Sequence, residues 1–295
     1  MKIYITDDFD PDKIIDSGQC FRPKRLDDGR YRFVTGRNVL HIFPLSSDTW
    51  QADCTPYAWK HIWYPYFDLE TDYKKLRAKI PKNDLFLKKA AAYGSGIRIL
   101  QQNSFEMLIT FIISQRKSIP AIRSAVEKLC RIAGTPVRTE TEDLYLFPSP
   151  SRLSRLSLET LRDCSLGYRA PYVRQAARMV TGGKIKMKEL SRLSDQDLLE
   201  QLQTIPGVGI KVASCVSLYG FHRTATAPVD VWIYRVISSH YNKKNPFPDF
   251  KKTAGLMQQY MFYYYRDHAD KWLFLIFFSQ NDWNHWTDFT TKHHI

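Results

Sequence analysis

The sequence predicts an α+β fold, with an N-terminal antiparallel sheet domain at residues 1–84 and a mainly helical domain at residues 85–295. Two observations predict this order. The first part carries short runs of β-branched and aromatic residues separated by turn residues, which are typical of antiparallel strands. From about Leu85 onward, apolar residues recur at the spacing of helices that bury one face.

The N-terminal elements are short strands. The runs "KIYI", "RYRFV" and "VLHIF" have strand composition, and "DDG" at 27–29 and "GRN" at 36–38 are turn sequences. They predict an antiparallel meander within roughly the first 80 residues.

The helical part carries start and stop signals. Pro120 and Pro171 suit the first turn of a helix, Ser194 precedes a leucine-rich run as an N-cap, and Gly182 follows a helix end. Residues 135–150 form the only long non-helical interruption. The predicted helices include "FEMLITFIISQ", "IPAIRSAVEKLCRIAG", "APYVRQAARMVTGG", "SDQDLLEQLQTI" and "KVASCVSLYG", and "KWLFLIFFSQNDWNHW" predicts a further, mostly buried helix with a tail.

The composition favours a nucleic-acid partner. The chain of 295 residues has a formal net charge of +13 and 14% aromatic residues, which suits phosphate neutralisation and base stacking. An acidic protein or a membrane surface would also attract such a charge. No apolar run is long enough to predict a transmembrane helix, and the first ten residues show no secretory signal.

The cysteines are scattered and odd in number. None of the five makes a Cys-x-x-Cys pair, so the sequence predicts reduced thiols in an intracellular protein, with neither a disulfide framework nor a zinc site. They are Cys20, Cys54, Cys130, Cys164 and Cys215.

The stretch "TIPGVGIKVASC" at 204–215 predicts two helices joined by a glycine hairpin, over about 196–220. Gly207 and Gly209 would allow close approach to unpaired N–H groups at a helix start, which suits a phosphate oxygen. A tight turn without any ligand explains the glycines equally well. Lys211 stands in the first turn of the second helix.

A carboxylate follows in the loop at about 225–232. Asp230 comes nineteen residues after Lys211 (230 − 211) and directly before a predicted helix, so capping alone would explain it. The two side chains could instead converge, because an amine beside an apolar pocket is a competent nucleophile and a carboxylate can stabilise a developing cation.

These residues resemble a known family. "IPGVGIKVASC" followed by "APVDV" is similar to the helix-hairpin-helix DNA glycosylases that have a catalytic lysine. "SGQCFR" at 17–22 and "LGYRAPYV" at 166–173 resemble the 8-oxoguanine DNA glycosylases, and "FIISQ" and "FFSQND" fit the superfamily. The motifs stand in the family's order between residues 17 and 281.

The resemblance implies a bifunctional DNA glycosylase and apurinic-site lyase that excises 8-oxoguanine from duplex DNA in base excision repair. The damaged base would be flipped out of the stack. Lys211 would then attack the anomeric carbon, form a Schiff base and permit β-elimination, while Asp230 would stabilise the oxocarbenium-like state.

The resemblance also implies a base pocket. The Gly18 carbonyl would accept the N7 hydrogen that guanine lacks, Cys215 and Phe278 would contact the two faces of the base, and Pro228 would form a wall. Phe274 would stand where the family has a glutamine that reads the Watson–Crick edge. A turn at Gly18 and ordinary core packing for the others are the simpler interpretations of these residues alone.

Four further residues are implied to contact the duplex. Tyr168 matches the family's wedge, Arg169 its contact to the unpaired cytosine, and Gln115 the glutamine at the end of "FIISQ". Arg116 stands where an asparagine is expected, and Ala121 where an arginine would read the cytosine, so Arg116 would replace the lost reader.

Phosphate binding is implied at Gly207, Val208 and Gly209, with Trp232 where a histidine often contacts phosphate. The resemblance implies no required cofactor. It does imply a K⁺ or Na⁺ site formed by main-chain carbonyls alone, those of Gln203, Ile205 and Val208. No iron–sulfur cluster is expected, since no cysteine follows Cys215.

Two alternatives remain open at this stage. One is a glycosylase of the same fold for another damaged purine, such as an alkylated one, and the other is a non-catalytic hairpin protein that binds DNA. In every case we expect double-stranded DNA as the partner, no membrane association, a monomer, and a place in the cytoplasm or nucleoid if the source is bacterial.

Overall fold

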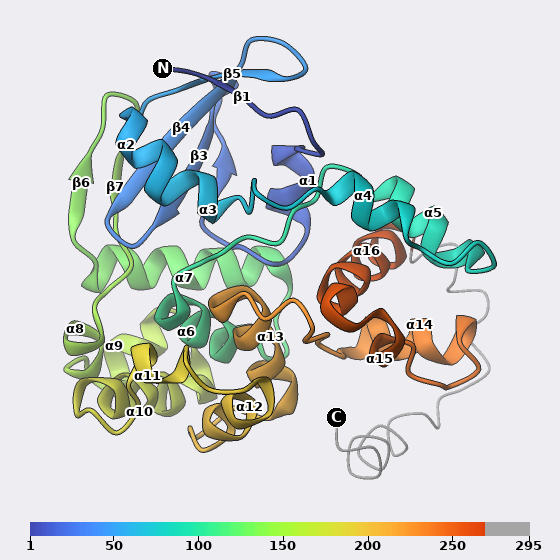
Figure 1. Ribbon diagram of the computed structural model, residues 1–295. Coiled ribbons are helices and arrows are strands. Elements are labelled where there is room, and N and C mark those ends of the chain that lie inside the picture. Colours follow the sequence, from blue (N-terminus) through green and yellow to red (C-terminus); the bar gives the residue numbers. More distant parts are fainter. Residues whose placement is uncertain (269–295) are drawn as a thin grey trace.

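The computed structural model describes residues 1–268 and has a sheet at its N-terminal end and helices over the rest (Figure 1). The sheet has the strand order β1-β5-β4-β3-β2, and all its pairs are antiparallel. Its strands are β1 (Lys2–Tyr4), β2 (Lys24–Arg25), β3 (Tyr31–Thr35), β4 (Asn38–Pro44) and β5 (Thr49–Ala52). The predicted fold class is therefore confirmed.

The sheet is shorter than the sequence predicted. It ends at Ala52, and short helical segments follow where we expected the meander to continue. Trp63, Tyr66 and Phe67 recur at helical spacing, so a helix buries them on one side. The rings of Tyr66 and Phe67 pack against Phe33 of β3, and Trp63 packs against both of them. The segments are α2 (Pro56–Ala58), a π-helical turn (Trp59–Trp63), α3 (Tyr64–Tyr66) and α4 (Tyr73–Ala78).

The helix α1 (Pro11–Asp16) packs Ile14 and Ile15 into the core of the sheet. The remaining described helices form one large apolar core around α6, which is buried along almost its whole length and packs against α13, α7 and α10. They are α5 (Leu85–Tyr93), α6 (Ser104–Ser114), α7 (Ile119–Ala133), α8 (Pro150–Ser154), α9 (Leu158–Asp163), α10 (Ala170–Thr181), α11 (Met187–Leu190), α12 (Asp195–Gln203), α13 (Ile210–Phe221), α14 (Val231–His240), α15 (Phe247–Phe250) and α16 (Ala254–Asp267). Short 3₁₀ turns lie at Gly167–Arg169 and Lys251–Thr253.

Local signals predicted the helix ends well. Pro120 and Pro171 lie in the first turns of α7 and α10, the Ser194 side chain caps α12, and Gly182 ends α10. The non-helical segment after α7 is a hairpin of β6 (Pro136–Arg138) and β7 (Asp143–Tyr145), and its Leu144 packs on Val34 of the sheet. Within residues 1–268, no helix has the length and apolar character needed to cross a bilayer.

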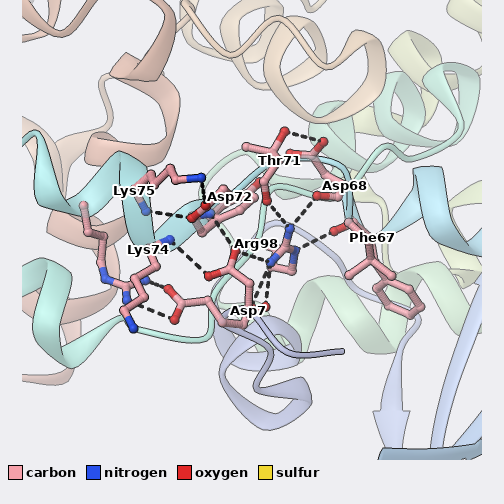
Figure 2. A network of polar contacts seen from close by, with 12 residues as sticks. Asp7, Phe67, Asp68, Thr71, Asp72, Lys74, Lys75 and Arg98 are labelled. Carbon is pink, nitrogen blue, oxygen red and sulfur yellow. Dashed lines mark hydrogen bonds and ion pairs between the residues drawn. The ribbon is translucent and has the colours of Figure 1, made fainter. Parts of the chain in front are cut away.

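A buried arginine joins the sheet part to the helical part (Figure 2). Arg98 is only 1% exposed, and its guanidinium donates to the carbonyl oxygens of Phe67, Asp68 and Thr71 and of Asp7 and Asp8. Hydrogen bonds to a charged donor are stronger than neutral ones, and these gather two distant loops around one group. Arg98 thereby fixes the position of the loop before α1 relative to the loop before α4.

Candidate active site

One cavity of about 600 Å³ collects six of the predicted residues: Gly18, Lys211, Cys215, Pro228, Asp230 and Trp232. Its walls come from the loop after α1, the α6–α7 connection, α13, the start of α14 and α16. A concave site with a few convergent polar groups is the usual form of a ligand pocket. The structure thus brings together residues that lie more than two hundred positions apart in the chain.

Lys211 is the second residue of α13 and reaches the cavity from the hairpin side. Its Nζ lies 5.6 Å from the centre of the Phe111 ring, and Cys215 follows one helical turn later on the same face. Burial lowers the pKa of the Lys211 ammonium, but the neighbouring Cys215 and Asp230 groups raise it, and the net direction is upward. Burial raises the pKa of the Cys215 thiol, and the neighbouring Lys211 opposes that rise.

Asp230 caps α14, as its place in the sequence predicted. Its Oδ1 accepts hydrogen bonds from the N–H groups of Trp232 at 3.0 Å and Ile233 at 2.9 Å. Burial raises the pKa of the Asp230 carboxyl above its ordinary value, although Lys211 and these two amide donors oppose the rise. The Asp230 side chain therefore both caps α14 and lines the cavity. Trp232 also lines the cavity.

Gly18 lies in the left-handed region with φ +81°, and the adjacent Phe262 leaves no room for a side chain. A Cβ there would lie 3.0 Å from Cε1 of Phe262. Only glycine adopts this conformation readily. The turn at "SGQ" therefore places backbone, without a side chain, against the cavity.

The sequence analysis missed the cavity residues on α16, among them Gln258 and Phe262. Gln258 and Phe262 both line the cavity, and they lie four residues apart on one face of the helix. Gln258 is 4% exposed, and its Oε1 has no hydrogen-bond partner among the described residues. No local signal could have found them, because the Gln-x-x-x-Phe spacing in "QQYMF" also occurs on helices of an ordinary core. Phe274 and Phe278, the residues predicted for this wall, lie outside the described residues.

A second, shallower cavity of about 410 Å³ lies over the glycine hairpin between α12 and α13. It is lined by the loop residues 203–209 together with Gln115, Tyr168 and Tyr172. Gln115 donates from Nε2 to the Gly207 carbonyl at 3.1 Å, which ties the end of α6 to the hairpin. Because α13 begins directly after Gly209, its free N–H groups open beside this groove. Three of the predicted phosphate-binding residues, Gly207, Val208 and Gly209, thus share one surface with Gln115 and Tyr168. The fourth, Trp232, lines the first cavity instead.

The two arginines predicted to read the opposite base differ in their surroundings. Arg169 is buried, and its guanidinium donates to the carbonyl oxygens of Gln115 and Leu166. Arg116 is exposed in a left-handed conformation with φ +52°, directly after the end of α6. Tyr168 is 52% exposed and stacks its ring under the Arg169 guanidinium. In this arrangement Arg116 is the arginine that is free to contact a partner.

The carbonyls predicted for a monovalent cation belong to residues of this groove, Gln203, Ile205 and Val208. The Ile205 carbonyl already accepts the N–H of Val208 at 3.0 Å, which leaves one of its lone pairs available. Over residues 1–268, no cluster of three or more His, Cys, Asp or Glu side chains could hold a metal ion. Any ion here would depend on main-chain oxygen alone.

Comparison with known families gives two adjoining matches. The family described as 8-oxoguanine DNA glycosylase, N-terminal domain, matches residues 2–108, and the HhH-GPD superfamily base excision DNA repair protein matches residues 109–260. A probable N-glycosylase/DNA lyase of Methanothermobacter thermautotrophicus is 30% identical over 199 residues. That match spans 59% of this chain and 64% of the relative's own length.

Solved structures are similar over most of the chain. The structure of MBOgg1 in complex with a low-affinity DNA ligand has a TM-score of 0.86 and 36% identity, covering 91% of this chain and 96% of that one. The Clostridium acetobutylicum 8-oxoguanine glycosylase/lyase, in complex with duplex DNA that contains cytosine opposite 8-oxoguanine, has a TM-score of 0.83 and 29% identity. The two chains are covered to 90% and 94% in that comparison.

Proposed function

Since the chain belongs to the HhH-GPD superfamily of base excision DNA repair proteins, we propose that it is a bifunctional DNA glycosylase and apurinic-site lyase for 8-oxoguanine in duplex DNA. The single observation that carries the proposal is the convergence of Lys211, Asp230 and Gly18 on one cavity. An amine, a carboxylate and a backbone turn are the three groups that this chemistry needs. The similar solved structures include a glycosylase/lyase bound to such DNA.

Lys211 would act as the nucleophile. Its neutral Nζ forms a bond to C1′ of the flipped nucleotide while the C1′–N9 bond breaks, and the base leaves with the bonding electron pair and takes up a proton. Nζ then loses one proton, and the C1′–O4′ bond of the sugar breaks while O4′ takes up a proton, which gives a protonated Schiff base. That cation acidifies C2′–H, so β-elimination breaks the bond to the 3′ phosphate.

Asp230 would assist at two points. Because the ammonium form of Lys211 predominates near neutral pH, a proton must leave Nζ before attack, and Asp230 is a carboxylate whose charge acts on that group. The same carboxylate would stabilise the positive charge that develops on the sugar. Its two backbone hydrogen bonds hold it in place for both tasks.

The cavity walls would select the base. The Gly18 carbonyl would accept the N7 hydrogen of 8-oxoguanine, and a guanine, which lacks that hydrogen, would leave the acceptor unpaired at an energetic cost. The buried Oε1 of Gln258 has no hydrogen-bond partner among the described residues, and it would accept a hydrogen bond from the Watson–Crick edge of the base. This is the role that the sequence analysis found unfilled at Phe274. Phe262 and Cys215 would contact the two faces of the base, so we assign to Phe262 the stacking role first given to Phe278.

The hairpin groove would hold the DNA backbone. The N–H groups around Gly207, Val208 and Gly209 would bind a phosphate at the start of α13, with a K⁺ or Na⁺ on the neighbouring carbonyls. Tyr168 would fill the gap left by the flipped base, and Arg116 would contact the base opposite. We further propose that the protein acts as a monomer inside the cell, without an iron–sulfur cluster or any membrane association.

Borohydride trapping tests the proposal directly. The protein is incubated with a duplex carrying one 8-oxoguanine opposite cytosine, and a covalent protein–DNA adduct is expected because borohydride reduces a Schiff base. Lys211→Gln should give no adduct and no strand cleavage while still binding the duplex. An adduct that forms only on a pre-formed abasic site would support the lyase activity and refute 8-oxoguanine as the substrate base. Duplexes with alkylated purines would then be screened. Absence of adduct on both duplexes would refute the catalytic assignment and favour a DNA-binding protein without chemistry.

A further inference from the structure

The turn at Gly18 is fixed by a hydrogen bond from α16, which is distant in the sequence. The side chain of Gln259, on α16, donates from Nε2 to the carbonyl of Ser17 at 2.6 Å, across 242 residues of sequence. Gln259 is only 1% exposed. Its Oε1 in turn accepts a hydrogen bond of 2.5 Å from the hydroxyl of Tyr219 on α13. The Nε2 and Oε1 atoms of Gln259 thus each make a hydrogen bond.

The residue after Gly18 is held equally firmly. Gln19 is fully buried and donates from Nε2 to the hydroxyl of Ser17 and to the carbonyl of Arg98, both at 2.9 Å. Its Oε1 accepts the N–H of Leu100 at 2.9 Å, and its own carbonyl accepts from Gln102 at 2.8 Å. The Ser17 carbonyl before Gly18, and the side chain and carbonyl of Gln19 after it, therefore have fixed partners.

This arrangement matters because glycine is the residue with the greatest backbone freedom. A peptide unit is planar, so a hydrogen bond to the Ser17 carbonyl also fixes the plane that contains the Gly18 N–H. Without that bond, rotation about the Gly18 dihedrals would turn its carbonyl away from the cavity at little cost. Among the described residues, the Gly18 carbonyl itself accepts no hydrogen bond.

We propose that Gln259 and Tyr219 form a clamp of positioning residues that aims the Gly18 carbonyl at the base and so sets discrimination between oxidised and normal guanine. The clamp is defined as these two side chains and the Ser17 carbonyl that they hold. The inference rests on the proposed function, since it assigns the origin of specificity within the same site. Gln259 does not itself line the cavity; it acts through Ser17.

The test separates base recognition from the chemistry at Lys211. Gln259→Leu keeps a side chain of similar size and removes both hydrogen bonds. Single-turnover excision of 8-oxoguanine should fall at least tenfold. Cleavage of a pre-formed abasic site should fall less than twofold, because no base has to be recognised there. Tyr219→Phe leaves the amide in place and should give a smaller loss of excision, about threefold. Gln51→Leu, on the exposed face of β5, is the matched control and should change neither rate.

A second variant tests a pH dependence that would not arise if the role of Gln259 were purely structural. Gln259→Glu retains the shape, but an ionised carboxylate cannot donate to the Ser17 carbonyl and would repel it. A protonated carboxyl can donate, and burial raises the pKa of a carboxyl group. Excision by Gln259→Glu relative to wild type should therefore recover as the pH falls from 8 to 5.5, while its abasic-site cleavage keeps the wild-type profile.

The outcomes are distinct. An equal fall of both activities in a normally folded Gln259→Leu would overturn the inference, because the clamp would then support the lysine or the fold in general. Unchanged excision in Gln259→Leu would overturn it as well. Failure of the wild-type protein on both substrates would instead refute the proposed function. Wild-type cleavage of the abasic duplex alone would refute the base assignment on which the clamp depends.

Discussion

Gly207 lies directly against the ring of Tyr172, so closely that a Cβ on Gly207 would be 2.5 Å from the Cγ atom of that ring. Gly207 also has φ +84°, which disfavours any side chain. Gly209, two residues later, has a negative φ of −90° and no atom within 4 Å of the position of a Cβ. Packing against Tyr172 therefore explains the first glycine of the hairpin, whereas no contact among the described residues requires a glycine at the second position.

The two hairpin glycines should respond differently to alanine. Gly207→Ala should lower the free energy of unfolding by about 1–3 kcal/mol, because it strains the backbone and clashes with Tyr172. Gly209→Ala should leave stability within about 0.5 kcal/mol yet weaken duplex binding about tenfold, since its methyl group would stand in the path of a phosphate. Urea titration and fluorescence anisotropy measure the two effects. Normal binding by a stable Gly209→Ala protein would contradict phosphate contact at the hairpin.

Asp230→Asn should separate capping from catalysis. Asparagine caps a helix as well as aspartate does, so the free energy of unfolding should change by less than about 1 kcal/mol. Excision of 8-oxoguanine should fall about a hundredfold, because the amide can neither accept the Lys211 proton nor offset positive charge on the sugar. Single-turnover rates and thermal unfolding test this. Asp230→Ala is the capping control and should lose about 1 kcal/mol of stability in addition.

Gln258→Leu and Phe262→Leu should weaken base recognition by different routes. Gln258→Leu removes the unpartnered buried oxygen and should reduce the preference for 8-oxoguanine over other damaged purines about tenfold. Phe262→Leu removes a stacking surface and should raise KM for every base lesion alike. Competition between lesion duplexes checks the first effect, and KM values measured separately for each lesion duplex check the second. If neither variant changes excision, residues beyond the described part of the chain, such as Phe274 and Phe278, would be the ones that contact the base.

Arg116→Ala should change the ranking of bases opposite the lesion. Arg116 is exposed at the end of α6, whereas Arg169 is engaged with two carbonyl oxygens. Loss of a side chain that reads a base edge should reduce the preference for cytosine about tenfold. Excision rates from duplexes with each of the four opposite bases measure it. Arg37→Ala, an exposed arginine in the β3–β4 turn, is the control, and an unchanged ranking in Arg116→Ala would exclude Arg116 as the reader.

Glu106 should make stability depend on pH. Burial raises its pKa from 4.5 to about 7, and Arg22 only partly offsets the rise. A raised carboxyl pKa in the folded state means that its contribution to stability is full below pH 4.5 and is lost as the pH rises to about 7. As the pH rises from 5 to 8, the free energy of unfolding of Glu106→Gln should therefore increase relative to that of wild type by on the order of 2–3 kcal/mol. Urea unfolding across that range checks it, and parallel profiles for the two proteins would contradict the shift.

Short-range patterns in the sequence were sufficient for much of the fold and for half of the site. The Ser194 and Asp230 caps, the first-turn prolines and the glycine hairpin depend on contacts within a few residues, so their signals are local. Lys211 was predicted in the first turn of its helix and lies there. The strand composition likewise predicted β3 and β4 with their turn, because an antiparallel pair is closed by adjacent residues.

The remaining features were decided by contacts between distant segments. Gln258 and Phe262 reach the cavity only because α16 packs across α5 and α14, and nothing local in "QQYMF" distinguishes a cavity wall from ordinary core. Gln259 meets Ser17 across 242 residues. A sequence specifies which side chains are available, but burial and hydrogen-bond partners depend on how whole helices pack. Lys211 and the turn at Gly18 could therefore be predicted from the chain alone, whereas the group that aims Gly18 could be identified only from the tertiary structure.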